Sequence, residues 1–342
     1  MGYHFDESRL DDELALSTSD ALLRNLAESG ARVRTAASDA AEAVEAGLVR
    51  NQDSRPRAVI AAGPDSRLLR AVLEPWCPVP FVAWPGSGLP GWAGSLDLVV
   101  ILAPDRSDST SASAVAEALR RGCEVAVACP PDSMVAEHAA GRWTTLLPTD
   151  SGDQLATAVV MLDYLNRLDL GPPGDAEEVS RALDDVAVAS SPHRDLAVNP
   201  AKMLAIALAD STPVVWGGSV LAARAARRVA ESIRRATGRT ALAEDVEHLL
   251  PVLEATPPRD VFDDPFSEDS GAARPVLLVL DDGVDDPVVR EQRGRLRSVA
   301  ESRGIRVESV TTDARSEVSR YASLHLAGKY AAAYLQLGLV PN

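Results

Sequence analysis

The segment DLVVILAPDRSDSTSASAVAEALRRGCEVAVAC (97–129) carries the clearest indication of the architecture of this chain. Two unbroken apolar runs, 97–104 and 123–130, stand on either side of a window with helical spacing, SASAVAEALRRG (111–122). Strands that are apolar on both faces are typical of a parallel sheet covered by helices on both sides. The segment therefore predicts a strand, a turn rich in hydroxyl groups, a helix and a second parallel strand.

Comparable runs extend the pattern in both directions. Further strands are expected at AVIAAG (58–63), VPFVAWPG (79–86), WTTLLPT (143–149), TPVVWGGS (212–219), PVLLVLDDG (275–283) and IRVESVTT (305–312). Helical windows alternate with them, and the first fifty residues are expected to form helices that end at Gly30 and Gly47. This alternation predicts the α/β class, with two three-layer α/β/α domains that contain parallel sheets.

The segment GPPGDAEE (171–178) interrupts the alternation with proline and glycine. A chain of 342 residues is long enough for two domains. We therefore expect an N-terminal domain with leading helices over 1–170, a linker over 171–194 and a C-terminal domain over 195–342.

The charge balance excludes some classes of partner. A formal net charge of −16, with 50 acidic and 34 basic residues, argues against nucleic acid and against an anionic membrane surface. The excess is uneven, since residues 1–200 carry a net charge of −14, whereas residues 220–239 hold six arginines and one glutamate. A local basic patch therefore remains that suits a single phosphate.

Several other classes of protein are also disfavoured by the sequence. No apolar stretch reaches the roughly 20 residues of a membrane span, and the acidic start of the chain is unlike a secretory signal. The cysteines, Cys77, Cys123 and Cys129, form neither a CxxC pair nor an even framework. These features predict a cytoplasmic protein.

The turn after the apolar run 97–104 is the strongest candidate for a ligand site. Five hydroxyl side chains crowd the start of the following helix, which is more than one N-cap needs: Ser107, Ser109, Thr110, Ser111 and Ser113. Hydroxyl and free N–H groups at a helix start suit a phosphate. The alternative is an ordinary capped loop exposed to solvent.

Two other turns from strand to helix offer small residues for a ligand. Gly63 and Ser66 follow one strand, and Gly217, Gly218 and Ser219 follow another. Neither turn reads GxGxxG, and the pattern GxxxxGK[ST] is absent. A small phosphorylated ligand is therefore favoured over a nucleotide cofactor, although tight turns without any ligand would explain the glycines equally well.

Metal and nucleophile chemistry find little support. The histidines are His4, His138, His193, His248 and His325. They show no HxH, HExxH or Cys/His spacing, and no GxSxG motif is present. We expect neither a metal nor a cofactor.

Three segments together resemble the bifunctional phosphoglucose/phosphomannose isomerase family of the sugar isomerase (SIS) fold. LAESGARVR (26–34) resembles the opening helix, residues 97–129 resemble the phosphate loop with its flanking strands, and GKYAAAYLQLGLVP (328–341) resembles the closing helix. The resemblance implies two SIS domains that bind a phosphosugar, a homodimer, a role in carbohydrate metabolism and aldose–ketose isomerisation of hexose 6-phosphates.

The resemblance also implies site residues, and some family positions differ here. Arg228 matches an arginine-rich helix that would contact substrate, but the family's proton-abstracting glutamate falls near Arg234 or Arg235. Glu247 and His248 are the candidates for the catalytic base and the ring-opening histidine. Two alternatives to an active isomerase stay open: a catalytically inactive phosphosugar-binding regulator, and a structural partner that keeps the fold only for subunit contacts.

Overall fold

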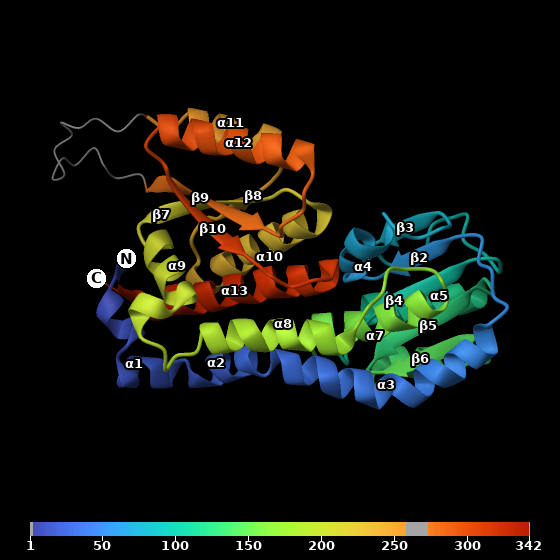
Figure 1. Cartoon of the computed structure of the whole chain (residues 1–342). Coiled ribbons are helices and arrows are strands. Elements are labelled where there is room, and N and C mark those ends of the chain that lie inside the picture. The colour runs from blue at the N-terminus through green and yellow to red at the C-terminus, as the bar shows by residue number, and fades with distance from the viewer. Residues whose placement is uncertain (1–2, 258–272, 342) are drawn as a thin grey trace, which may run out of the picture. The chain divides into compact units, whose positions relative to one another are not determined.

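The computed structural model describes residues 3–257 and 273–341 and contains two compact units (Figure 1). One unit is Ser29–Arg181, and the other joins Met1–Glu28 to Ala182–Asn342. Each unit holds a parallel sheet with helices on its faces, so the predicted α/β class with parallel sheets is confirmed. The first residues of the described chain pack with its second half, and the first unit ends at Arg181.

The unit Ser29–Arg181 is built on a parallel sheet of order β3-β2-β4-β5-β6. The strands are β2 (Val59–Ala62), β3 (Phe81–Trp84), β4 (Leu98–Leu102), β5 (Glu124–Cys129) and β6 (Thr144–Pro148). The helices are α3 (Ser29–Asn51), α4 (Ser66–Leu73), α5 (Ser109–Arg120), α6 (Met134–His138), α7 (Gln154–Arg167) and the start of α8 (Ala176–Ala189).

Alternate residues of the central strands enter opposite layers of this unit. Ile60, Val99 and Val125 join one hydrophobic cluster with Val115 of α5 and Val135 of α6. The intervening strand residues are equally buried, and α3 and α7 pack on β6 and β5. Burial on both faces explains why these strands are continuous apolar runs.

The expectation that helices end at Gly30 and Gly47 is wrong, since α3 runs through both. A Cβ atom on Gly47 would lie 2.6 Å from Cγ2 of Thr145 and 3.1 Å from Cε2 of Tyr164. Glycine at this position therefore allows α3 to approach β6 and α7 closely. Such packing offsets the cost of about 1 kcal/mol that glycine imposes inside a helix.

The other unit is built on a parallel sheet of order β10-β9-β7-β8. The strands are β7 (Ser211–Gly217), β8 (Leu242–Ala243), β9 (Arg274–Asp281) and β10 (Arg306–Thr311). The helices are α9 (Pro200–Leu208), α10 (Val220–Thr237), α11 (Val246–Glu254), α12 (Pro287–Ser302) and α13 (Glu317–Gly338). In Figure 1, α11 and α12 cover one face of the sheet, and α10 and α13 lie on the other.

Residues near the N-terminus belong to this second unit through specific contacts. Strand β1 (Tyr3–Phe5) pairs antiparallel with β11 (Leu339–Pro341), and the helices α1 (Glu13–Thr18) and α2 (Asp20–Ala27) follow. The Lys202 side chain on α9 donates a hydrogen bond of 2.6 Å to Asp11. Among the described residues, no helix is both long and apolar enough to cross a membrane.

Candidate functional site

In each of the two parallel sheets the chain first adds a strand on one side of the starting strand and then continues on the other side. In open α/β sheets, ligands bind beyond the carboxyl ends of the strands at this switch point. In the unit Ser29–Arg181 the switch point lies between β2 and β4, and in the other unit it lies between β7 and β9. The predicted turns at Gly63, Ser107–Ser111 and Gly217–Ser219 therefore follow the strands that border these two points.

At the first switch point, Ser111 fills the space beside Gly63. The glycine has a φ of +88°, and a Cβ atom there would lie 2.5 Å from Oγ of Ser111. Ser111 is fully buried, and the Asp108 carboxylate accepts its N–H at 2.9 Å and its hydroxyl at 2.5 Å. Asp108 is thus the N-cap of α5. The structure brings Gly63 and Ser111 together, with the serine hydroxyl already bound to a carboxylate.

Among the other hydroxyl groups of this turn, that of Ser107 forms a hydrogen bond and those of Ser109 and Thr110 form none with the residues that the structure describes. The Asp105 carboxylate accepts both the N–H and the hydroxyl of Ser107, at 2.9 Å each, and these bonds lower the pKa of Asp105. Within the described chain, the hydroxyls and backbone N–H groups of Ser109 and Thr110 have no hydrogen-bond partner. They are the donors of the turn that remain open to a ligand.

Two further features surround this turn. The Arg106 guanidinium pairs with Asp132 at 3.3 Å and with Asp150. Ser66 is buried at the start of α4, and its hydroxyl has no hydrogen-bond partner in the described residues. Asp105 and Asp108 were not among the predicted site residues. Their spacing is nevertheless a known signal, because an aspartate two or three residues before a serine at a helix start commonly caps the helix.

At the second switch point the glycines serve packing. A Cβ atom on Gly217 would lie 2.3 Å from the backbone of Ala222, and one on Gly218 would lie 2.3 Å from Cγ1 of Val289. Ser219 caps α10 by accepting the N–H of Ala222 at 3.0 Å, and its hydroxyl donates to the buried Asp282. A serine hydroxyl therefore bonds an aspartate at both switch points.

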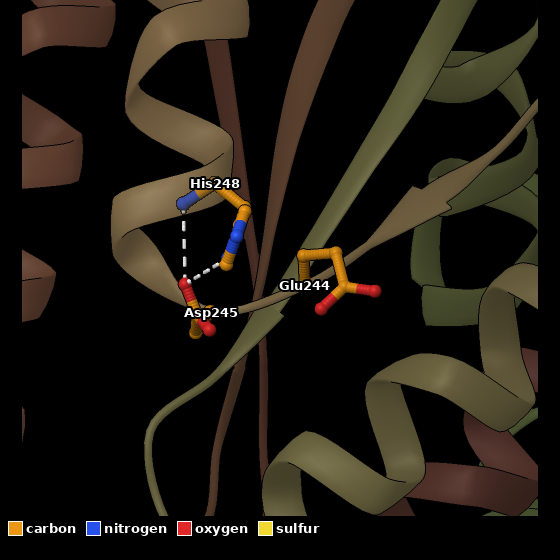
Figure 2. A group of neighbouring side chains, drawn as sticks. All are labelled: Glu244, Asp245 and His248. Carbon is orange, nitrogen blue, oxygen red and sulfur yellow. Dashed lines mark hydrogen bonds and ion pairs between the residues drawn. The ribbon is translucent and has the colours of Figure 1, made fainter.

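The two catalytic candidates lie on the exposed first turn of α11. The Glu247 carboxylate pairs with Arg295 of α12 at 2.9 Å. His248 is held by Asp245, the N-cap of α11, which accepts the backbone N–H at 3.1 Å and lies 2.8 Å from Nδ1 (Figure 2). The structure gives each residue its own ion-pair partner and forms no shared acid–base pair between them.

The hydrogen bond to Asp245 raises the pKa of His248 above its usual 6.5. An Asp245→Asn variant keeps a good N-cap but removes the negative charge. We expect it to lower the pKa of His248 toward 6.5, measured by following the ring protons in an NMR titration. An unchanged pKa would show that the pair does not persist in solution. Glu247→Gln, which leaves the Asp245–His248 hydrogen bond intact, is the control.

Figure 2 also shows Glu244 beside Asp245 and His248. Each residue offers one oxygen or nitrogen atom of the kind that binds a metal ion, and these atoms lie within 4.8 Å of one another. All three residues are exposed. The three residues lie within positions 244–248, in a spacing that differs from the HxH and HExxH motifs. The Arg227 guanidinium lies 3.8 Å from Glu244. Cationic partners thus already lie close to the group.

Arg228 does not reach the turn at Gly217–Ser219. It lies more than two turns into α10 and pairs with Glu231 at 2.7 Å. Together with Arg224 and Lys329 it surrounds His325 of α13, which is buried. Burial, followed by the charges of these neighbours, lowers the pKa of His325 far below 6.5, so this imidazole is neutral.

Comparison with known proteins identifies the fold of the second unit. Residues 197–338 match the family described as "Bacterial phospho-glucose isomerase C-terminal SIS domain". The match covers β7 to β10 and most of the helices around them. No curated protein matches the chain.

Solved structures share the fold across both units. The C-terminal domain of glucosamine-fructose-6-phosphate aminotransferase from Francisella tularensis is 11% identical with a TM-score of 0.66, covering 93% of this chain and 96% of that one. Tagatose-6-phosphate ketose/aldose isomerase from Escherichia coli is 11% identical with a TM-score of 0.64, covering 92% of each. A glucose-6-phosphate isomerase like protein from Thermus thermophilus is 16% identical with a TM-score of 0.51, covering 86% and 88%.

Proposed function

Because this chain has the SIS fold and resembles the phosphoglucose/phosphomannose isomerase family, as its sequence predicted, we propose that it binds a sugar phosphate. The observation that supports this most is the open pair of N–H groups at Ser109 and Thr110. They begin a helix of twelve residues beside a switch point, where the helix dipole favours an anion. A hexose 6-phosphate is the proposed ligand.

The carboxylates of the turn limit the affinity. Asp105 and Asp108 lie on either side of Ser107 and repel a phosphate that carries a charge of about −1.5 to −2. Arg106 supplies a positive charge, but two aspartates already pair with it. We therefore propose weak binding, with a Kd of about 1 mM, which corresponds to −4.1 kcal/mol.

We further propose that the chain binds the sugar phosphate without isomerising it. Aldose–ketose isomerisation needs a positioned base and a ring-opening acid, each of which contributes about 10²–10⁴-fold. Both Glu247 and His248 are exposed. Glu247 already forms an ion pair with Arg295, and His248 already forms one with Asp245. An isomerase is the alternative, and turnover of glucose 6-phosphate or mannose 6-phosphate in a coupled assay would establish it. The expected result is no turnover above the uncatalysed rate.

Binding is tested by calorimetry with glucose 6-phosphate, and with glucose as the ligand without the phosphate. A Ser109→Pro variant removes one open N–H from a first helical position, where proline is tolerated. We expect it to abolish detectable binding, whereas Ser109→Ala, which keeps the N–H, retains it. Equal binding by both variants, or no heat from the wild type at millimolar ligand, would refute the proposed site.

The homodimer implied by the resemblance and the cytoplasmic location predicted from the sequence remain part of the proposal. A homodimer gives twice the chain mass of 36.1 kDa in light scattering after size exclusion. The mass of a single chain at micromolar concentration would contradict it.

A further inference from the structure

A cavity of about 440 Å³ lies within the unit Ser29–Arg181, away from the switch point. Facing sides of α3 and α7 line it, together with the turn Pro173–Ala176. Cavities of a few hundred Å³ are the usual size of small-molecule sites. This cavity takes no part in the proposed sugar-phosphate site.

Small apolar side chains form part of the walls of the cavity, and charged and amide side chains form the rest. Ala37, Ala40 and Ala41 line it from α3, and Val159 and Val160 line it from α7. Alanine leaves the room that a longer side chain would fill, and its methyl group offers apolar contact. The walls therefore suit a slender aliphatic chain.

Asp163 is the charged group of this cavity that has no hydrogen bond. It is partly buried on α7, and in residues 3–257 and 273–341 no group donates a hydrogen bond to its carboxylate. Glu45 pairs with Arg167 at 2.6 Å, and Asp175 accepts the N–H groups of Glu177 and Glu178 at the start of α8. The neighbouring acids are thus occupied while Asp163 is not.

The electrostatic environment of Asp163 favours a cationic ligand. Burial raises the pKa of its carboxyl; Arg167 opposes the shift, while Glu45 and Asp175 add to it. A partly desolvated carboxylate that accepts no hydrogen bond is costly, and an ammonium group that donates hydrogen bonds to it removes that cost. A single free carboxylate does not provide the several oxygen ligands that Mg²⁺ or Ca²⁺ requires.

We propose that this cavity binds a small aliphatic amine, with the ammonium group on the Asp163 carboxylate and the methylene groups against the alanines of α3. The ammonium donates hydrogen bonds to the carboxylate oxygens. The alkyl chain displaces water from the apolar walls. The rim pair Glu45–Arg167 borders the site, and its two charges act on Asp163 in opposite directions.

The test compares three probes of the same length: n-butylamine, n-butanol and butyrate. Calorimetry or NMR shift mapping on the full chain is expected to show binding of n-butylamine alone. An Asp163→Asn variant is expected to weaken it at least about tenfold, a change of 1.4 kcal/mol. Ala41→Leu, which fills the cavity from an exposed helix position, is expected to do the same.

The control is Asp39→Asn, which removes an exposed acid of α3 that does not line the cavity. It should leave n-butylamine affinity unchanged. Binding of n-butylamine should also weaken as the pH falls and the Asp163 carboxyl takes up a proton. Equal affinity for n-butanol, full affinity in Asp163→Asn, or no binding of n-butylamine at tens of millimolar would each overturn the proposal.

Discussion

A Lys202→Met variant is expected to lose about 3 kcal/mol of stability, which lowers the midpoint of thermal unfolding by roughly 6–12 °C. The Lys202 side chain is fully buried. Its ammonium donates to Asp11 at 2.6 Å and to the carbonyl oxygens of Pro192 and Arg194 at 2.9 Å each. Methionine keeps the aliphatic packing but leaves all three acceptors without this donor.

The control for Lys202 is Arg235→Met, which removes a cation from an exposed ion pair with Glu231. Exposed pairs contribute about 0–1 kcal/mol, so this variant should unfold close to the wild type. Circular dichroism during heating measures both. Equal midpoints for the two variants would contradict the structural role given to Lys202.

The effect of Lys202→Met should also depend on pH. The hydrogen bond from Lys202 lowers the pKa of Asp11 below its usual 3.8. A lowered acid pKa stabilises the folded state above the unfolded pKa, and this stabilisation is lost as the pH falls through the folded value. The difference between wild type and variant is therefore expected to be full at neutral pH and to shrink below about pH 3.8. Unfolding curves at pH 7 and at pH 3 measure this difference.

The strands could be predicted because they are buried on both faces. Residues 97–104 and 123–130 carry no polar alternation, and the structure places β4 and β5 within them as parallel neighbours. Helix α10 shows the same kind of signal, since its apolar and arginine side chains alternate at helical spacing. These signals lie within short segments, so they can be recognised in the sequence without the structure.

Other features depend on contacts between distant segments. The pairing of β1 with β11 joins the two ends of the described chain, and no local pattern indicates it. A side chain at Gly47 would collide with Thr145 and Tyr164, which lie about a hundred positions away in the sequence. The predicted site is different: the bonds of Ser107 to Asp105 and of Ser111 to Asp108 span only two and three positions, so the capping pattern that indicates them is present in the sequence.

These bonds make Asp108 the residue whose change should affect ligand affinity most. An Asp108→Asn variant is expected to bind glucose 6-phosphate roughly 10- to 100-fold more tightly than the wild type. Asparagine is as good an N-cap as aspartate, so α5 keeps its start while the negative charge is removed. Two like charges about 4 Å apart near a protein surface repel by up to about 4 kcal/mol, and salt and solvent reduce this to the expected range.

The comparison with Asp53→Asn separates this local effect from the net charge of the chain. Asp53 is exposed and precedes β2, so it lies toward the amino ends of the strands, whereas Asp108 follows β4 at their carboxyl ends. Both variants lose one negative charge, but only Asp108→Asn should tighten binding, and the gain should fall as salt is added. Equal affinities for the two variants would place the phosphate away from α5. A gain for Asp108→Asn alone would show that a capping carboxylate competes with the ligand for the start of this helix.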